Sequence, residues 1–465
     1  MIKLTPSQQR FVASFPTWFT SSNTIAILEG DGGCGKTTVL KLALEAQPLN
    51  RFKQKALILA ETNEAVNVLR SKLGMEYEHI KTVCSAFNLV HGVDHEGNDG
   101  LKQHKEPEFE GITLLVIDEA SMLASSRLKM ILTLCRELGI YVLLIGDRDQ
   151  LPPVEGNLAE FDQCISPAFL EQWYLDNGFS IPVTYNLTEP CRNTSDIYEF
   201  CTGVKKLLRP KAFGLVPDKY QRGFNFLKQY LTSAEGNEAF LTGKAVILAH
   251  TNKRVAELNS LVRTELFGKA SQDTWLVGDR IIFRQPTKCF DRPVTDGNNY
   301  FESLLKQRGE ILTTNTKAII KKVGYKTVCS LTVAELYIHS NHFVKGHQDG
   351  YILVPIDRKE ALIEWNKKNL SARFEHDTSL RQKKYQLRNA FCTVFNIGIT
   401  QGSEEDTRRD TKHSYAMTVH CSQGSSIQTV FVDEKDVTSV KNKTFRKKLQ
   451  YVAYSRAVSM LVRLI

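Results

Sequence analysis

The sequence predicts an α/β protein with parallel sheets covered by helices, and three observations support this fold class. Short apolar runs of strand character recur along the chain. Stretches of helical period, such as "NEAVNVLRSKL" and "NKRVAELNSLVRTEL", lie between them. This alternation is typical of buried parallel strands that helices cover on both faces. A chain of 465 residues is too long for one hydrophobic core, so several domains are expected.

Each strand-like run is followed by turn residues or by a helical pattern, as parallel sheets require. The runs expected to form strands are residues 24–30 ("TIAILEG"), 56–62 ("ALILAET"), 113–120 ("TLLVIDEA"), 142–147 ("VLLIGD"), 245–251 ("AVILAHT"), 429–434 ("TVFVDE") and 459–465 ("SMLVRLI"). Two interruptions break this rhythm. Residues 88–110 are polar, Gly-rich and too long for a plain connection. Between residues 284 and 413 the pattern becomes mixed, with basic patches such as "RQKKYQLR", and predicts an inserted domain because the rhythm then resumes.

Composition and charge narrow the classes of protein that the chain fits. The net charge of +9 fits a polyanionic partner but also a merely basic surface. No apolar run reaches membrane-spanning length, and no signal peptide is expected. The ten cysteines are scattered singly, which argues against a disulfide framework or a zinc site and favours a reducing cytoplasm. His91, Asp94 and His95 are interpreted as a solvated loop rather than a metal site.

The stretch "GDGGCGKTT" predicts a phosphate-binding loop. It matches the pattern GxxxxGK[ST] through Gly30, Gly35, Lys36 and Thr37, directly after a strand and before a helical stretch. Glycines let backbone N–H groups point inward, and a helix N-terminus adds positive potential. The residues expected to bind nucleotide here are Gly30, Gly32, Gly33, Cys34, Gly35, Lys36, Thr37 and Thr38. Cys34 is interpreted as a small loop residue, with a stabilised, reactive thiolate as the alternative.

Two further stretches supply the groups that phosphoanhydride hydrolysis needs. "LLVIDEAS" places Asp118 and Glu119 at the carboxyl end of a buried strand. Asp118 and Thr37 are expected to bind Mg²⁺, and Glu119 to polarise the attacking water. In "GDRDQLPPV", Gln150 can reach a γ-phosphate or the attacking water, although a plain tight turn explains this stretch equally well.

Near the end of the chain, "YVAYSRA" poses a problem of charge. Read as a helix, the apolar stripe Leu449, Val452 and Ala453 continues to Arg456. A buried arginine needs an anionic partner. The expected anion is the γ-phosphate of ATP, because an arginine finger stabilises the charge that develops during phosphoryl transfer.

In order, and over nearly the whole chain, these stretches resemble superfamily 1 helicases, in the 5′→3′ branch that contains the RecD and Pif helicases and a phage helicase. The similarities are "LTPSQQRFV" to the Q motif, "GDGGCGKTT" to motif I, "AETNEAVNVL" to Ia, "TVCSAFNL" to Ib, "VIDEAS" to II, "GDRDQLPPV" to III, "LTEPCRNT" to IV, "TVHCSQGSS" to V and "YVAYSRA" to VI. The resemblance implies two RecA-like P-loop domains with an inserted accessory domain and a small hairpin insertion. The implied layout is a first RecA-like ATPase domain at 1–190 with a hairpin or wedge insertion at 88–110, a second RecA-like domain at 191–283 and 414–465, and the accessory domain at 284–413.

The resemblance also implies roles for single residues. Lys36, Glu119, Gln150, Arg192 and Arg456 carry out catalysis, with both arginines coming from the second RecA-like domain. Gln8 lies against adenine, and Gly424 joins the nucleotide-binding residues. The residues expected to contact DNA are Thr62, Asn63, Thr82, Ser85, Pro152, Asn252, His420 and Ser422, with local turn capping as the alternative for the small polar ones. Leu101 is the candidate wedge. Two departures from the family pattern, Ser426 and Cys421, remove expected contacts to ribose and to phosphate.

The expected function is ATP-dependent, 5′→3′ translocation on single-stranded DNA with unwinding of duplex, using ATP and Mg²⁺. A phage role in DNA replication or recombination, in the host cytoplasm or in a bacterium, follows from the resemblance. The expected partners are single-stranded DNA and duplex junctions, with a single-stranded-DNA-binding or replisome protein as a candidate and no membrane; the monomer is the expected working form. The alternatives are a translocase that mainly displaces bound proteins, an RNA helicase of the same superfamily, and a metabolic P-loop kinase, which would leave most motifs unexplained.

Overall fold

The computed structural model describes residues 4–45, 55–74, 79–93, 99–103, 105–153, 167–189, 191, 196–208, 215–268, 274–295, 301–341, 348–370, 378–398 and 410–465. The chain forms two compact units. One comprises Met1–Phe224, Ile247–Asn252 and Thr418–Ile465, and the other comprises Asn225–Val246 and Lys253–Met417. Among the described residues, no helix combines the length and the apolar character that crossing a bilayer requires.

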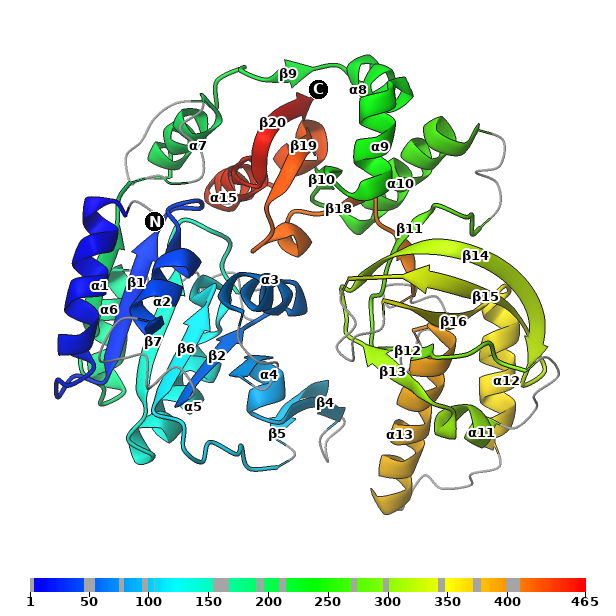
Figure 1. Cartoon of the computed structure of the whole chain (residues 1–465), viewed down its shortest axis with the longest axis horizontal. Coiled ribbons are helices and arrows are strands. Elements are labelled where there is room, and N and C mark those ends of the chain that lie inside the picture. Colours follow the sequence, from blue (N-terminus) through cyan, green and yellow to red (C-terminus); the bar gives the residue numbers. More distant parts are fainter. Residues whose placement is uncertain are drawn as a thin grey trace. The chain divides into compact units, whose positions relative to one another are not determined.

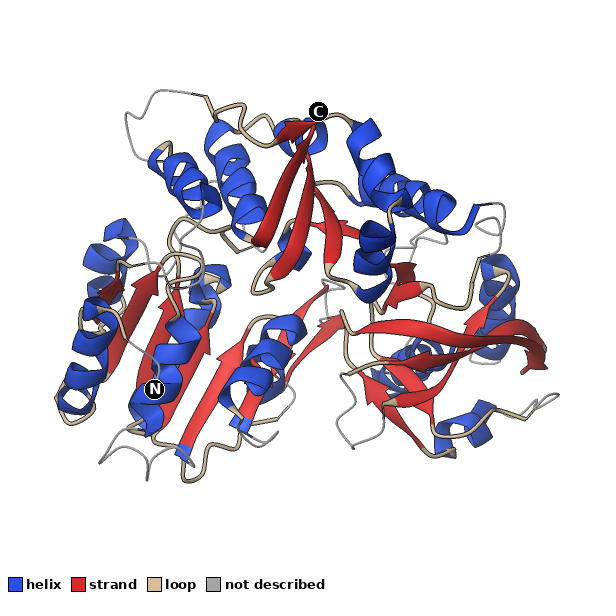
Figure 2. Cartoon of the chain, turned by 45° about the horizontal axis from the view of Figure 1, so that its top comes forward, coloured by secondary structure: helices blue, strands red, loops and turns tan. Residues whose placement is uncertain are grey.

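The first unit contains a six-stranded sheet in the order β3-β2-β6-β7-β1-β8, in which every pair of neighbours is parallel. Its strands are β1 (Ile25–Gly30), β2 (Ala56–Ala60), β3 (Ile80–Thr82), β6 (Leu114–Asp118), β7 (Tyr141–Gly146) and β8 (Val183–Leu187). β1, β2 and β6 are buried along their whole length, which explains their continuous apolar runs. Figure 2 shows these strands side by side with helices packed over them.

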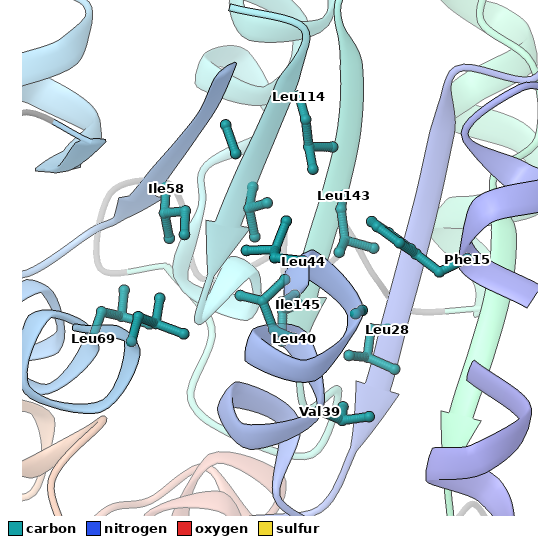
Figure 3. Packing of buried hydrophobic residues seen from close by; sticks show 14 of the residues in the cluster. Phe15, Leu28, Val39, Leu40, Leu44, Ile58, Leu69, Leu114, Leu143 and Ile145 are labelled. Atoms are coloured by element: carbon teal, nitrogen blue, oxygen red, sulfur yellow. The ribbon is translucent and has the colours of Figure 1, made fainter. Parts of the chain in front are cut away.

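Helices cover both faces of this sheet because alternate strand residues point to opposite sides. On one face lie α1 (Pro6–Trp18), α2 (Lys36–Glu45) and α3 (Asn63–Leu73), packed on strand residues such as Leu28 and Ile145. Figure 3 shows Val39, Leu40 and Leu44 of α2 directed at this face. On the other face, α4 (Val83–Ala86), α5 (Ser125–Glu137) and α6 (Pro167–Asp176) share a core with residues such as Ile27 and Leu144.

A second sheet has the order β18-β10-β19-β20-β9. Its strands are β9 (Gln221–Arg222), β10 (Ala245–Ala249), β18 (Ala416–Thr418), β19 (Ile427–Asp433) and β20 (Ala457–Leu464), and β20 pairs in parallel with both β19 and β9. The helices of this part are α7 (Asp196–Lys206), α8 (Phe224–Thr232), α9 (Ala234–Thr242), α10 (Asn252–Phe267), α14 (Glu434–Thr438) and α15 (Lys443–Ser455). The predicted fold class, parallel sheets flanked by helices, is therefore confirmed.

The predicted insertion at residues 88–110 contains an antiparallel hairpin of β4 (Leu89–Val93) and β5 (Asp99–Gln103). Leu101, the candidate wedge, pairs with His91 in the backbone register. The side chains of residues 90–104 lie outside the described part of the structure, so the wedge assignment stays a prediction.

The second unit contains a seven-stranded sheet in the order β13-β12-β16-β15-β14-β11-β17. Its strands are β11 (Arg280–Ile282), β12 (Thr287–Phe290), β13 (Gly309–Leu312), β14 (Lys317–Val328), β15 (Leu331–His339), β16 (Asp349–Pro355) and β17 (Lys412–His413), and all neighbours are antiparallel. The helices are α11 (Phe301–Lys306), α12 (Arg358–Leu370) and α13 (Thr378–Phe395). In Figure 1 the long strand β14 arches beside β15. Two separate apolar clusters pack on this sheet.

Candidate active site

The phosphate loop lies between the end of β1 at Gly30 and the start of α2 at Lys36. Gly33 and Gly35 have φ values of 94° and 74°, which side chains with a Cβ rarely adopt. A Cβ on Gly30 would lie 2.9 Å from Cβ of Leu187, so the loop also needs glycine for close packing. Lys36 Nζ donates to the backbone oxygens of Gly30 (2.7 Å) and Asp31 (3.2 Å), across the curl of its own loop. The loop thus has the form that cradles phosphate at a helix N-terminus.

Gln8 contacts the outside of this loop. It is buried, and its Nε2 donates to Cys34 O (2.9 Å) and to Cys191 Sγ (3.0 Å). Its Oε1 accepts from Thr5 N (3.0 Å) as part of a capping box at the start of α1, which fixes the side-chain amide. Cys191 N also donates to Gly33 O (3.0 Å). Gln8 therefore supports the loop, and its contact with adenine stays a prediction.

Asp118 is the last residue of β6, and Glu119 follows it directly. Asp118 is buried, and its Oδ1 accepts from Glu119 N (2.9 Å). Burial raises the pKa of Asp118 to about 6, the charge of Glu119 adds to the rise, and Lys36 opposes it. Glu119 adopts a left-handed backbone conformation (φ 53°), a strained state that is common at functional sites. Its Oε2 is buried and makes no hydrogen bond within the described residues, so it is available to a ligand or to water.

Gln150 belongs to the turn that follows β7. Its backbone N donates to Asp147 O (3.1 Å), and its side chain is 1% exposed and lines the same cavity as Lys36. Tyr451 OH of α15 donates to Asp147 Oδ2 (2.8 Å), and Lys448 Nζ donates to Arg148 O (3.1 Å). The turn is therefore held by α15, the helix that precedes Arg456.

Arg456 is the C-cap of α15, one residue beyond the end of the helix. Leu449, Val452 and Ala453 are fully buried, as the apolar stripe predicts, and Arg456 is only 3% exposed. Its guanidinium donates to Val452 O (3.1 Å), Ser455 Oγ (3.0 Å) and Ser425 O (3.5 Å), all uncharged oxygens. Its Nη2 lies 3.6 Å from the place that a Cβ on Gly32 would occupy. Within the described residues this buried cation has no acidic partner, and it adjoins the phosphate loop.

One cavity brings most of the predicted catalytic and nucleotide-binding residues together. It is lined by Gly32, Gly33, Gly35, Lys36, Thr37, Thr38, Ala65, Val68, Lys72, Asp118, Glu119, Gln150, Cys191, Gly424 and Arg456. Gly424 has φ 78°, and a Cβ there would contact Ala65 at 3.4 Å. Gly30 and Cys34 belong to the phosphate loop and Gln8 contacts it, but none of the three lines the cavity. Arg192 lies outside the described residues, and its neighbour Cys191 is in place at the cavity wall.

Sequence reasoning missed Cys191 and the cavity-facing side of α3. Ala65 and Val68 lie within the motif Ia stretch and Lys72 lies just beyond it; their helical spacing was the available signal. For Cys34 the small-residue interpretation is the better one, because the thiol is 1% exposed. Burial, then Asp31, raises the pKa of Cys34 to about 11, so the alternative of a stabilised thiolate is wrong. The nearby Lys36 lowers this pKa too little to compensate.

The residues expected to contact DNA have mixed surroundings. Thr62 Oγ1 accepts from Ala65 N (3.2 Å) and Thr82 Oγ1 accepts from Ser85 N (3.1 Å), so both threonines cap helices, as the alternative interpretation expects. Ser422 is fully buried, and its Oγ donates to Val419 O (2.7 Å). The others are placed as follows: Pro152 is buried, Asn63 and His420 are half-buried, and Ser85 and Asn252 are exposed.

His420 lies in a small aromatic group. Its ring is 6.2 Å from the His250 ring and 6.0 Å from the Phe445 ring, measured between centroids. Burial, together with His250, lowers the pKa of His420 to about 4, so the ring is neutral at pH 7. Asp436 Oδ2 accepts from the backbone N atoms of His250 (2.6 Å) and Thr251 (2.8 Å), which orients the turn before α10.

Comparison with known proteins agrees with this geometry. Residues 3–161 match the family described as an AAA domain, and residues 413–465 match the UvrD-like helicase C-terminal domain. The chain is 27% identical over 286 residues to the ATP-dependent DNA helicase dda of Enterobacteria phage T4, an alignment that covers 58% of this chain and 59% of the relative. It is 21% identical, over an alignment 515 positions long, to an uncharacterized protein of Acanthamoeba polyphaga mimivirus, with 98% of each chain covered.

Solved structures share the fold. The crystal structure of Bacteroides Pif1 bound to ssDNA has a TM-score of 0.51 at 16% identity, covering 100% of this chain and 92% of that chain. Pif1 helicase from Candida albicans has a TM-score of 0.50 at 16% identity, covering 100% and 94%. The fold and the cavity define a P-loop nucleotide-binding protein. The matched domains and the similarity to the phage helicase Dda support the predicted resemblance to superfamily 1 helicases of the Pif/RecD-like group.

Proposed function

We propose that this chain is an ATP-dependent DNA helicase that moves 5′→3′ along single-stranded DNA and unwinds duplex. The observation that carries the proposal is the single cavity lined by Lys36, Asp118, Glu119, Gln150 and Arg456. Lys36 and the loop backbone hold the β- and γ-phosphates, and Glu119 Oε2 takes a proton from the attacking water. Gln150 orients that water, and the Arg456 guanidinium stabilises the charge that develops on the transferred phosphoryl group.

A magnesium ion fits the oxygen donors present. The Thr37 hydroxyl and the buried Asp118 carboxylate line the same cavity, and Mg²⁺ in nucleotide sites is bound by one or two protein oxygens together with phosphates and water. Mg²⁺ would supply charge neutralisation between the β- and γ-phosphates. We assign Gln8 to adenine and Arg192 to the second arginine of the site, on the sequence resemblance.

The nucleic-acid substrate is proposed from the relatives. The phage relative is described as an ATP-dependent DNA helicase, and one Pif1 structure contains ssDNA. We propose that Thr62, Asn63, Thr82, Ser85, Pro152, Asn252, His420 and Ser422 form the strand-binding surface and that Leu101 separates the strands. Thr62 and Thr82 combine this role with helix capping, and Ser422 acts through the turn that it holds together.

The domain layout is proposed as two RecA-like domains at 1–190 and at 191–283 with 414–465. The antiparallel sheet of the second unit is proposed as the accessory domain that helps hold DNA. We further propose that the protein works as a monomer in the cytoplasm of a bacterium or a phage-infected host, in DNA replication or recombination. A single-stranded-DNA-binding or replisome protein is the proposed protein partner.

The test measures ATP hydrolysis and strand separation on duplexes with a 5′ tail or a 3′ tail, with Lys36→Ala as the variant without hydrolysis. Hydrolysis stimulated by single-stranded DNA, and unwinding of only the 5′-tailed duplex, are expected. Preference for a 3′ tail would contradict the polarity. Stimulation by single-stranded RNA rather than DNA would indicate an RNA helicase, and hydrolysis without unwinding a protein-displacing translocase. Hydrolysis independent of nucleic acid would contradict the proposal altogether.

A further inference from the structure

A buried lysine outside the known motifs joins the two loops that form the phosphate end of the cavity. Lys205, near the end of α7, has a side chain that is only 12% exposed. Its Nζ pairs with the carboxylate of Asp31 in the phosphate loop, with Asp149 Oδ2 at 3.0 Å and with Asp147 Oδ1 at 3.8 Å. These four residues are called the Lys205 cluster below.

The acids of the cluster flank the residues that form the cavity. Asp31 precedes Gly32 and Gly33 of the cavity wall, and Asp149 precedes Gln150. Asp147 and Asp149 have side chains that are 1% and 8% exposed, and the side chain of Asp31 is 23% exposed, so solvent screens their mutual repulsion poorly. A bound nucleoside triphosphate would bring further negative charge to the cavity beside these acids.

Lys205 supplies the positive charge that faces all three carboxylates of the cluster. Burial lowers the pKa of Lys205, but Asp147, Asp149 and Asp31 together outweigh burial and raise it, so the ammonium stays charged. Burial raises the pKa of Asp147, but Lys205 and Lys36 outweigh it and hold this pKa below its usual range. Without Lys205, these acids would face Lys36, which the phosphates need, together with Lys448 and with Arg148, which is already paired with Glu29.

We propose that Lys205 is a positioning residue for ATP binding and hydrolysis, the internal counter-ion that lets the phosphate loop and the Gln150 turn lie together beside a triphosphate. It touches neither substrate nor reacting atoms; it acts through Asp31 and Asp149. This role rests on the proposed function. It makes α7 a part of the nucleotide site, although no recognised motif lies on that helix.

The test measures the Kd of a fluorescent ATP analogue without nucleic acid, and the kcat and KM of hydrolysis. Lys205→Met is expected to weaken nucleotide binding about tenfold or more, since removing one partner of a buried ion pair leaves uncompensated charge. Lys205→Arg keeps the cation and is expected to stay within about threefold of the unchanged protein. Lys206→Met is the matched control, because Lys206 is the next residue of α7 and is exposed.

A second substitution separates the effect of charge on nucleotide affinity from the effect of packing. If Lys205 acts by neutralising acids, Asp149→Asn in the Lys205→Met background should recover at least about threefold in nucleotide affinity, a coupling that independent sites would not show. No recovery, or equal losses in Lys205→Met and Lys206→Met, would overturn the proposal. If Lys205→Met alone does not fold, nucleotide affinity is compared between Asp149→Asn and the double variant. A loss of affinity below about twofold in the double variant overturns the proposal. A protein that binds nucleotide but neither hydrolyses it nor unwinds DNA would refute the proposed function and leave this test valid.

Discussion

At the scale of single residues, Arg456 is a cation buried among uncharged oxygens. A buried charge without an ionic partner is costly, and an arginine that serves only the fold would have an acid beside it. Its three hydrogen bonds to Val452 O, Ser455 Oγ and Ser425 O satisfy part of the guanidinium and hold it beside Gly32. Function and stability therefore oppose each other at this position.

Arg456→Met tests this opposition. Turnover of ATP is expected to fall by about 10³-fold or more, as for other arginine fingers. The free energy of unfolding should stay the same or rise, because an apolar side chain of similar volume replaces an uncompensated charge. Steady-state ATPase and chemical denaturation measure the two quantities, and affinity for single-stranded DNA should not change. Normal turnover in this variant would remove Arg456 from catalysis.

His420 predicts a pH dependence of stability. Its pKa of about 4 in the folded protein is below the ordinary value of about 6.5 for an unfolded chain. The unfolded chain therefore binds more protons between these values, and stability is lost as the pH falls from about 6.5 towards 4. The loss amounts to at most about 3 to 4 kcal/mol. His420→Gln should flatten this part of the curve of unfolding free energy against pH, and an unchanged slope would show that the ring is not the source.

At the scale of elements, the sequence anticipates what depends on neighbouring residues. The strands β1, β2, β6 and β10 lie inside predicted apolar runs, and β7 begins one residue before its run. The phosphate loop was found because its glycines and Lys36 lie within a few residues of one another. The position of Arg456 followed from a helical stripe. Local spacing determines all these features.

The features that the sequence did not reveal depend on contacts between distant segments. Lys205 is separated from Asp31 by 174 positions, and nothing near Lys205 marks it as buried. In the second unit, Tyr415 OH donates to Asp279 Oδ1 (2.8 Å) and Arg263 pairs with Asp279 Oδ2 (2.9 Å), a buried polar group that no local pattern predicts. The antiparallel sheet of that unit was expected only as a mixed segment, because its pairing is set by tertiary contacts.

The start of α3 provides a test at this scale. Thr62 is the N-cap of this helix, so Thr62→Ala should cost about 1 kcal/mol of unfolding free energy. Thr62→Ser keeps the accepting oxygen, so its unfolding free energy should be close to that of the unchanged protein. If Thr62 also contacts DNA, Thr62→Ala weakens binding of single-stranded DNA as well. An unchanged Kd for DNA alongside the lost stability would leave capping as its only role.

At the scale of the whole molecule, the net charge of +9 and the small polar residues proposed to bind the strand predict recognition of the phosphate backbone. Backbone contacts carry no base information, so affinity should be nearly the same for single strands of different sequence. Each neutralised phosphate releases counter-ions, and the logarithm of the association constant should fall linearly with the logarithm of salt concentration. The expected slope is about −0.7 for each phosphate that a lysine or arginine neutralises, or about −2 or steeper in total for a basic chain.

Fluorescence anisotropy with labelled oligonucleotides of mixed and uniform sequence, from low to high salt, measures both quantities. Nucleotide binding by the same preparation serves as the control, because salt that unfolded the protein would abolish it as well. A preference of more than about tenfold for one sequence would require hydrogen bonds to base edges, each worth about 1–3 kcal/mol. A slope near zero would mean that stacking on aromatic side chains, rather than charge, holds the strand. A strong sequence preference would place the strand on a surface other than the small polar residues proposed to bind it, and a slope near zero would contradict the expected contribution of lysine and arginine.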